Sequence, residues 1–156
     1  MVDLLKSASK GFGLLDLIVT LVVASLLAAL AIPSYEAFTK RAKVAAAIGD
    51  IGEFSLAIES FRLRNNDRIP MTLEEIGIPV SLDPWGRPYE FLNIRAAGAG
   101  NGALRKDGSL NPLNTDFDVY SRGKDGESAG PLSAQNSRDD VLRANNGAFI
   151  GLGEDY

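Results

Sequence analysis

The 156-residue sequence contains no cysteine and no histidine. The chain can therefore form no disulfide, no zinc site built from Cys and His, no thiol nucleophile and no Ser-His-Asp triad. If its soluble part is a small exported domain, that domain must be held together in another way. Oligomerisation and a hard cation bound by oxygen ligands are the two candidates.

Positive charge is also in short supply, with 16 Lys and Arg against 20 Asp and Glu. The formal net charge is -4, and no basic stripe is available to displace counterions from a phosphate backbone. A nucleic-acid partner is therefore not expected. The apolar, aromatic and charged fractions are those of an ordinary globular protein, which excludes wholesale disorder.

The apolar residues are concentrated near the N-terminus. Residues 12–32 carry a single charged side chain, Asp16, and the run ends at Pro33. A helix of this length spans about 30 Å, which is enough to cross the hydrocarbon core of a bilayer. A cleaved signal peptide is disfavoured because the run is too long and contains Asp16. A plain signal anchor is a second interpretation, and basic residues on both sides leave its direction open.

A third interpretation comes from a resemblance. Lys10-Gly11-Phe12, Asp16 and Pro33, in this spacing, resemble the N-terminus of type IV pilins and type II secretion pseudopilins. The resemblance implies that residues 1–11 are a leader, which a prepilin peptidase removes after Gly11. Phe12 would then become the N-methylated first residue.

The same resemblance makes residues 12–33 the transmembrane and filament-core helix. Gly13 and Asp16 depart from the family, in which Thr and Glu are usual at these positions. The carboxylate of Asp16 has two interpretations. It can favour the dipole of its own helix, or it can pair with the new amine of Phe12 in a neighbouring subunit and set the register of a filament.

Beyond Pro33, which should bend or weaken the helix, an amphipathic pattern covers residues 34–64. The helix is predicted to continue to Arg64 and to end at Asn65-Asn66-Asp67. Its apolar stripe, expected to face a core, falls at steps of three and four residues: Val44, Ala47, Ile48, Ile51, Phe54, Ile58 and Phe61.

Residues 65–156 are predicted to form a soluble α+β domain. Thr72 to Glu75 has the pattern of a capping box for a short helix that Gly77 ends. Strands are predicted at 89–94 and 116–120, with a third at 148–151, and the stretch 96–115, rich in Gly, Ala and Asn, is predicted to be a long loop. The expected fold class is thus α+β, a long helix packed on a small antiparallel sheet, as in pilins.

Two further segments resemble the major pseudopilins. Asp83-Pro84-Trp85-Gly86-Arg87-Pro88-Tyr89 is similar to a turn typical of that subfamily, and Ser121 to Asp140 is similar to its calcium-binding loop. Calcium prefers six to eight oxygen ligands, and a glycine-bent loop with carboxylates can supply them. The resemblance implies the side chains of Asp125 and Asp139 as ligands, with the carbonyls of Arg122 and Glu127 and a further oxygen from Asp140 or Ser137. The alternative is a solvated acidic turn without a metal.

The leading functional hypothesis is a structural protein and not an enzyme: a pseudopilin subunit of a type II secretion system. The resemblance implies a single-pass protein of the bacterial inner membrane whose C-terminal domain lies in the periplasm. Its implied partners are copies of itself in a homopolymeric filament, prepilin peptidase, minor pseudopilins, and an inner-membrane assembly platform with its ATPase. The alternatives are a type IV pilin or minor pilin and, from a different class, a membrane-anchored periplasmic metal-dependent enzyme or binding module.

Overall fold

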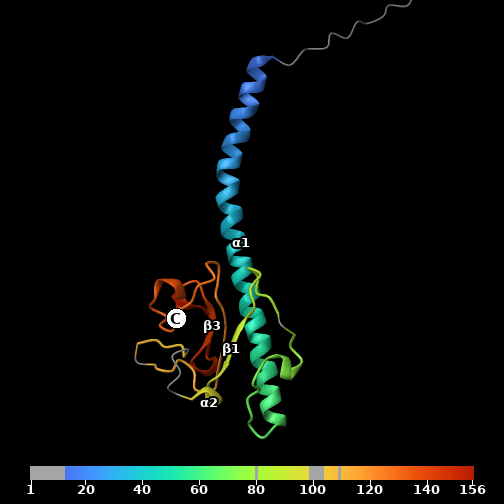
Figure 1. Cartoon of the computed structure of the whole chain (residues 1–156). Helices are drawn as coiled ribbons and strands as arrows, with labels where there is room; N and C mark the ends of the chain where they lie inside the picture. Colours follow the sequence, from blue (N-terminus) through green and yellow to red (C-terminus); the bar gives the residue numbers. More distant parts are fainter. Residues whose placement is uncertain (1–12, 80, 99–103, 109) are drawn as a thin grey trace, which may run out of the picture. The chain divides into compact units, whose positions relative to one another are not determined.

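The computed structural model describes residues 13–79, 81–98, 104–108 and 110–156. The leader and the two processing residues, Gly11 and Phe12, lie outside the described residues. The chain divides into two units, residues 1–39 and residues 40–156, and each is described by itself (Figure 1). Helix α1 (Leu14–Arg64) contributes its first half to one unit and its second half to the other.

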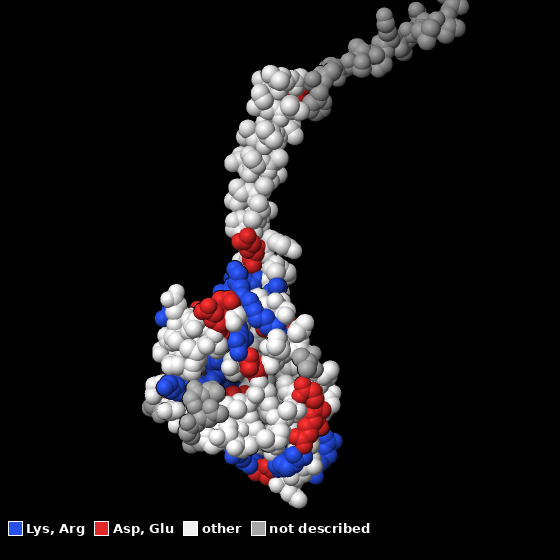
Figure 2. Space-filling model, in the orientation of Figure 1, with Lys and Arg blue, Asp and Glu red and all other residues white. Residues whose placement is uncertain are grey.

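The first half of α1 exposes nearly all of its apolar side chains. Figure 2 shows it as an almost uncharged surface. Among the described residues, α1 is the one helix long and apolar enough to cross a membrane. The helix is continuous through Pro33, so the predicted weak point does not interrupt it. The hydroxyl of Ser34, next to the proline, donates a hydrogen bond to the carbonyl of Leu30 at 3.1 Å.

The residues that α1 contributes to the hydrophobic core all lie in its second half. Ala47, Ile51, Phe54 and Ile58 are buried, and all four lie on the predicted stripe. The helix ends at Arg64, and the chain then reverses through two residues in the left-handed region, Asn66 and Asp67. Both the predicted core face and the predicted end of the helix are therefore confirmed.

The described residues form one antiparallel sheet in the order β1-β2-β3-β4. Two predicted strands are confirmed to within one residue, β1 (Glu90–Asn93) and β2 (Phe117–Ser121). The predicted third strand is also confirmed, as β4 (Phe149–Leu152). Sequence reasoning missed β3 (Val141–Ala144) because it has only four residues, includes Arg143 and shows no alternation: all four of its residues are buried.

The sheet has a hydrophobic cluster on each face. Phe117, Val119 and Val141 pack with the buried residues of α1 on one face. Side chains of alternate strand residues point to the other face, where Leu142 and Ala144 pack with Leu113 and Leu132 from the loops. The fold class is therefore α+β, with a long helix on a small antiparallel sheet, as expected.

The predicted loop 96–115 is irregular over most of its described residues, but several of its side chains are buried in the domain. It begins with a four-residue helix, α2 (Ile94–Ala97). Leu104, Arg105, Leu113 and Asn114 are all at most 5% exposed. This segment therefore completes the second cluster and supplies a charged side chain to the interior.

The predicted short helix forms as a single 3₁₀ turn, η1 (Glu74–Ile76). The predicted capping box does not form: the N-cap residue is Leu73, which makes no side-chain cap, and the carboxylate of Glu75 accepts a hydrogen bond from the backbone N–H of Met71 at 2.8 Å in place of that of Thr72. Gly77 ends the turn with a φ of 79°, as the sequence predicts.

Candidate functional site

Asp16 stands at the N-terminus of α1. Its Oδ2 accepts a hydrogen bond from the backbone N–H of Gly13 at 3.1 Å. A carboxylate in the first turn satisfies one of the free amide groups there and interacts favourably with the helix dipole. The geometry therefore supports the local interpretation of Asp16. Its pairing with the amine of a neighbouring subunit stays a prediction, because it concerns another chain and Phe12.

The turn before β1 is fixed by its first residue. Asp83 Oδ1 accepts hydrogen bonds from the backbone N–H groups of Trp85 and Arg87, both at 2.9 Å. Its second carboxylate oxygen accepts from the hydroxyl of Ser121, at the end of β2, at 2.5 Å. The segment that resembles major pseudopilins is thus a closed turn attached to the sheet.

Tyr89 ends this turn and joins the sheet to the helix. Its hydroxyl donates a hydrogen bond to Asp50 Oδ2 on α1 at 2.6 Å. Its ring meets that of Phe54 edge to face, with centroids 5.0 Å apart. Burial, followed by the hydrogen bond to Asp50, raises the pKa of the Tyr89 hydroxyl, so it stays a donor throughout the physiological range.

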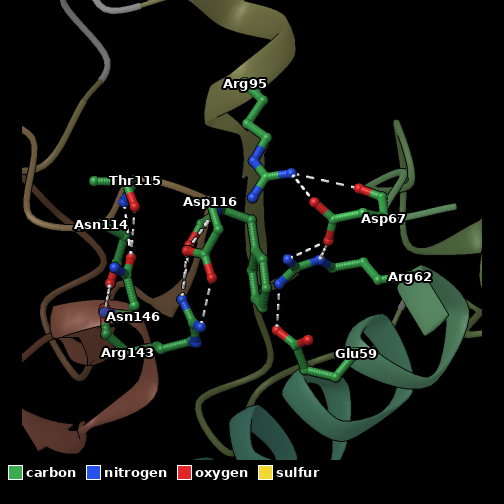
Figure 3. Close-up of polar contacts among 10 residues, drawn as sticks. Glu59, Arg62, Asp67, Arg95, Asn114, Thr115, Asp116, Arg143 and Asn146 are labelled. Carbon is green, nitrogen blue, oxygen red and sulfur yellow. Dashed lines mark hydrogen bonds and ion pairs between the residues drawn. The ribbon is translucent and has the colours of Figure 1, made fainter.

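A series of ion pairs connects the turn that follows α1 to the last turns of α1 and to α2 (Figure 3). Arg62 contacts Glu59 at 2.8 Å and Asp67 at 2.5 Å, and Arg95 of α2 contacts the other carboxylate oxygen of Asp67 at 2.6 Å. The hydrogen bonds from Arg95 and Arg62 lower the pKa of Asp67. Asp67 and Arg95 are exposed, so each pair contributes little by itself, and the chain of contacts mainly fixes geometry.

A second arginine pair lies inside the domain. Arg143 of β3 donates to both carboxylate oxygens of Asp116 at 2.8 and 2.7 Å (Figure 3). Its guanidinium also stacks 4.0 Å from the centre of the Phe117 ring. Both partners are buried. Burial alone would raise the pKa of Asp116, but the hydrogen bonds from Arg143 and from the Phe117 N–H outweigh it, and the pKa is lowered.

Two asparagines connect the turn after β3 to the segment before β2 (Figure 3). Asn114 Oδ1 accepts from the backbone N–H of Asn146 at 2.7 Å, and Asn146 Oδ1 accepts from the backbone N–H of Thr115 at 2.8 Å. The side-chain amide of Asn114 also donates to Asp118 at 2.8 Å. The two contacts with Asn146 were not predicted, since no local pattern pairs residues more than thirty positions apart.

The loop between β2 and β3 contains the predicted calcium ligands. Asp139 Oδ2 accepts hydrogen bonds from the backbone N–H groups of Lys124 at 2.8 Å and of Asp125 at 3.0 Å. Asp125 Oδ1 accepts from the backbone N–H of Glu127 at 2.8 Å. The loop therefore does bring Asp125 and Asp139 together, but through main-chain hydrogen bonds.

Three of the remaining predicted ligands, Asp140, Ser137 and the carbonyl of Arg122, have other partners. Asp140 is fully buried, and its Oδ2 pairs with Arg105 at 2.6 Å, whereas its Oδ1 has no hydrogen-bond partner among the described residues. The carbonyl of Arg122 accepts from the N–H of Gly126 at 3.2 Å, and the Ser137 hydroxyl bonds to the backbone of Ala129.

Calcium prefers six to eight oxygen ligands, and in this arrangement oxygens of Asp125, Asp139, Asp140 and Arg122 already accept hydrogen bonds within the protein. Nowhere in the described part of the chain do three acidic side chains gather closely enough to hold a metal ion. The calcium ion therefore stays a prediction of the resemblance.

Comparisons with known proteins find chains that are similar to this one over most of its length. The chain is similar to type II secretion system core protein G of Pseudomonas aeruginosa, with 29% identity over 80% of this chain and 90% of that protein. It is similar to core protein G of Aeromonas hydrophila, with 26% identity over 78% of this chain and 87% of that protein. The resemblance to the type IV pilin and type II secretion pseudopilin family is confirmed.

Matches to fimbrial proteins are shorter. The type IV major fimbrial protein FimA of Dichelobacter nodosus is 36% identical, but over only 36% of each chain. No family model matches the chain, and no solved structure matches it significantly. The pseudopilin-like character thus extends over the soluble domain as well as the helix, because a match over about 80% of the chain must include much of residues 40–156.

Proposed function

We propose that this chain is the major structural subunit of a type II secretion pseudopilus. The observation that supports this most strongly is the similarity to core protein G over most of both chains. An exposed apolar helix followed by a soluble α+β domain is the architecture that such a subunit requires, since the helix can lie in a membrane before assembly and in a filament core afterwards.

In this proposal the chain acts by assembly and not by catalysis. Prepilin peptidase removes residues 1–11 and the amine of Phe12 is methylated. Subunits then leave the inner membrane and polymerise in the periplasm, driven by a cytoplasmic ATPase through a membrane platform, with minor pseudopilins as further partners. Asp16 would pair with the amine of a neighbouring Phe12. The relatives are named as secretion-system core proteins and fimbrial proteins, which fits a non-enzymatic role.

Deletion of the gene in its own bacterium tests the proposal. We expect proteins that are normally secreted into the medium to accumulate in the periplasm, and the wild-type gene to restore their secretion. A matched variant, Gly11→Leu, should keep the leader and fail to restore secretion, because the peptidase site is inferred to admit only a minimal side chain at that position. Normal secretion by the deletion strain would refute the proposal.

A type IV pilin is the second candidate, and the fimbrial matches are the observation that favours it. The same deletion strain separates the two candidates. Loss of surface fibres, adhesion or twitching with unchanged secretion would identify a pilin, whereas loss of secretion alone identifies a pseudopilin.

A further inference from the structure

The loop between β2 and β3, residues 122–140, closes on itself through main-chain contacts. Asp139 reaches across the loop to the N–H groups of Lys124 and Asp125. Gly123 has a φ of 61°, and a Cβ atom placed there would lie 2.1 Å from the carbonyl oxygen of Asp139. Position 123 therefore requires glycine, because any side chain there would push its backbone away from that of Asp139.

Arg87 occupies the bend of this loop. Its guanidinium donates to the carbonyl of Gly123 at 2.8 Å and to that of Lys124 at 3.4 Å. A Cβ atom at Gly126 would lie 2.4 Å from Arg87 Cζ, so the guanidinium rests directly against the main chain. A positive charge thus binds two of the backbone oxygens that the bent loop exposes.

Arg105 holds the other end of the loop. It is 2% exposed, and it donates to Asp140 Oδ2 and to the hydroxyl of Ser128, both at 2.6 Å. Ser128 itself donates to the same carboxylate oxygen at 2.6 Å. The guanidinium also lies 4.3 Å from the centre of the Tyr120 ring. A buried carboxylate therefore has its counter-charge inside the protein.

We infer that Arg87 and Arg105 are the cations that hold the loop of residues 122–140, in the region where the resemblance to major pseudopilins predicts calcium, and that the loop folds without a metal ion. The two guanidinium groups bind the oxygens of Gly123, Lys124 and Asp140. Arginine is charged at every accessible pH and presents several N–H donors in a fixed plane, so it can bridge carbonyl and carboxylate oxygens permanently. The inference concerns folding of the domain and does not depend on the proposed secretion role.

The first test uses the full chain in detergent, with unfolding followed by heating and by limited proteolysis. We expect the same melting temperature and the same rate of cleavage within residues 122–140 in excess chelator and in millimolar calcium. A ligand that binds only the folded state would raise the melting temperature with its concentration. A fall of about 5 °C or more on chelation, with new cleavage in this loop, would overturn the inference.

The second test uses variants. Arg87→Met and Arg105→Met should each lower the melting temperature by about 5 °C or more and speed cleavage within residues 122–140, and calcium should not restore either property. Arg122→Met is the matched control, since Arg122 lies in the same loop and its side chain makes only an exposed pair with Glu90 at 2.7 Å. Cleavage of the two test variants at the rate of Arg122→Met would contradict the inference.

If Arg105→Met proves too unstable to purify, the double variant Arg105→Met, Asp140→Leu removes the buried charge together with its partner. We expect this protein to fold and to keep a melting temperature that is independent of calcium. A melting temperature that rises with calcium in the double variant would show that a metal site had been present beside the arginine, and would overturn the inference.

Discussion

At the residue scale, Asp16 is the position where local and intermolecular interpretations compete. The carboxylate caps its own helix through Gly13, and the resemblance gives it a partner in another subunit. Capping uses Oδ2 and needs only an acceptor oxygen, whereas an ion pair with the amine of a neighbouring subunit requires the negative charge. An uncharged side chain of the same shape therefore separates them.

Asp16→Asn keeps a good capping oxygen and removes the charge. If the intersubunit pair operates, we expect the variant to insert in the membrane and lose its leader normally but to yield few filaments, as Asp16→Ala should. Asp16→Glu should assemble at least as well as the wild type, because it restores the longer reach usual in the family. The yield of sheared filaments measures this. A normal yield from Asp16→Asn would leave Asp16 as a helix cap only.

The buried pair of Asp116 and Arg143 is a second single-residue determinant. Asp116→Asn leaves an uncompensated guanidinium in the interior, so we expect the free energy of unfolding at pH 7 to fall by about 3–5 kcal/mol. Urea unfolding of the detergent-solubilised chain measures the change. Asp155→Asn, at an exposed position, is the control and should change it by less than about 0.5 kcal/mol. Equal stabilities of the two variants would contradict a structural role for the pair.

The same pair predicts a dependence on acid. The folded state lowers the pKa of Asp116, so the unfolded chain binds this proton more readily than the folded chain. Its contribution is complete above the unfolded pKa of about 3.9 and is lost as the pH falls through the lower folded value. Wild-type stability should therefore decline more steeply below about pH 4 than that of Asp116→Asn. Parallel curves in a pH series of urea unfolding would rule this out.

At the scale of elements, α1 is one continuous helix whose two halves have opposite surfaces. The first half exposes its apolar side chains, whereas the second half buries one apolar stripe against the sheet. The stability of the soluble domain therefore depends on a few positions of the second half. Neighbouring apolar residues that point away from the stripe should contribute little to it.

Ile58 and Leu56 form a matched pair for this expectation, since Ile58 is fully buried and Leu56 is 74% exposed. Ile58→Ala should lower the free energy of unfolding by about 2–5 kcal/mol, through lost burial and a residual cavity. Leu56→Ala should change it by less than about 0.5 kcal/mol. Urea unfolding of both variants checks this, and similar losses would mean that the buried face has been assigned wrongly.

The sequence predicted best the elements that follow from local patterns. The helix, its end near Arg64, and the strands β1, β2 and β4 follow from periodicity and turn residues. The strand β3 has no such pattern, because both of its faces are covered. The side-chain hydrogen bonds of Arg87 and Arg105 to the loop could not be predicted, because they join residues 23 to 37 positions apart and depend on the complete fold.

At the scale of the whole molecule, the sequence and the comparisons lead to one interpretation. An apolar helix with a single acidic residue near its start, a short sheet on its second half and similarity to core protein G support the proposed role as a filament subunit. What this interpretation requires above all is processing, since the leader must leave before the amine of Phe12 can enter an apolar core.

The N-terminus of the protein purified from its own bacterial membrane tests this requirement most directly. Intact mass and N-terminal sequencing should show a chain of 145 of the 156 residues that begins at Phe12 and carries one methyl group on its amine. A chain that begins at Met1 would indicate a plain membrane anchor. A chain that begins at Ile32, directly after the small-x-small sequence Ala29-Leu30-Ala31, would indicate a cleaved secretory signal. Either result would contradict the assignment of this chain as a pilin-like filament subunit.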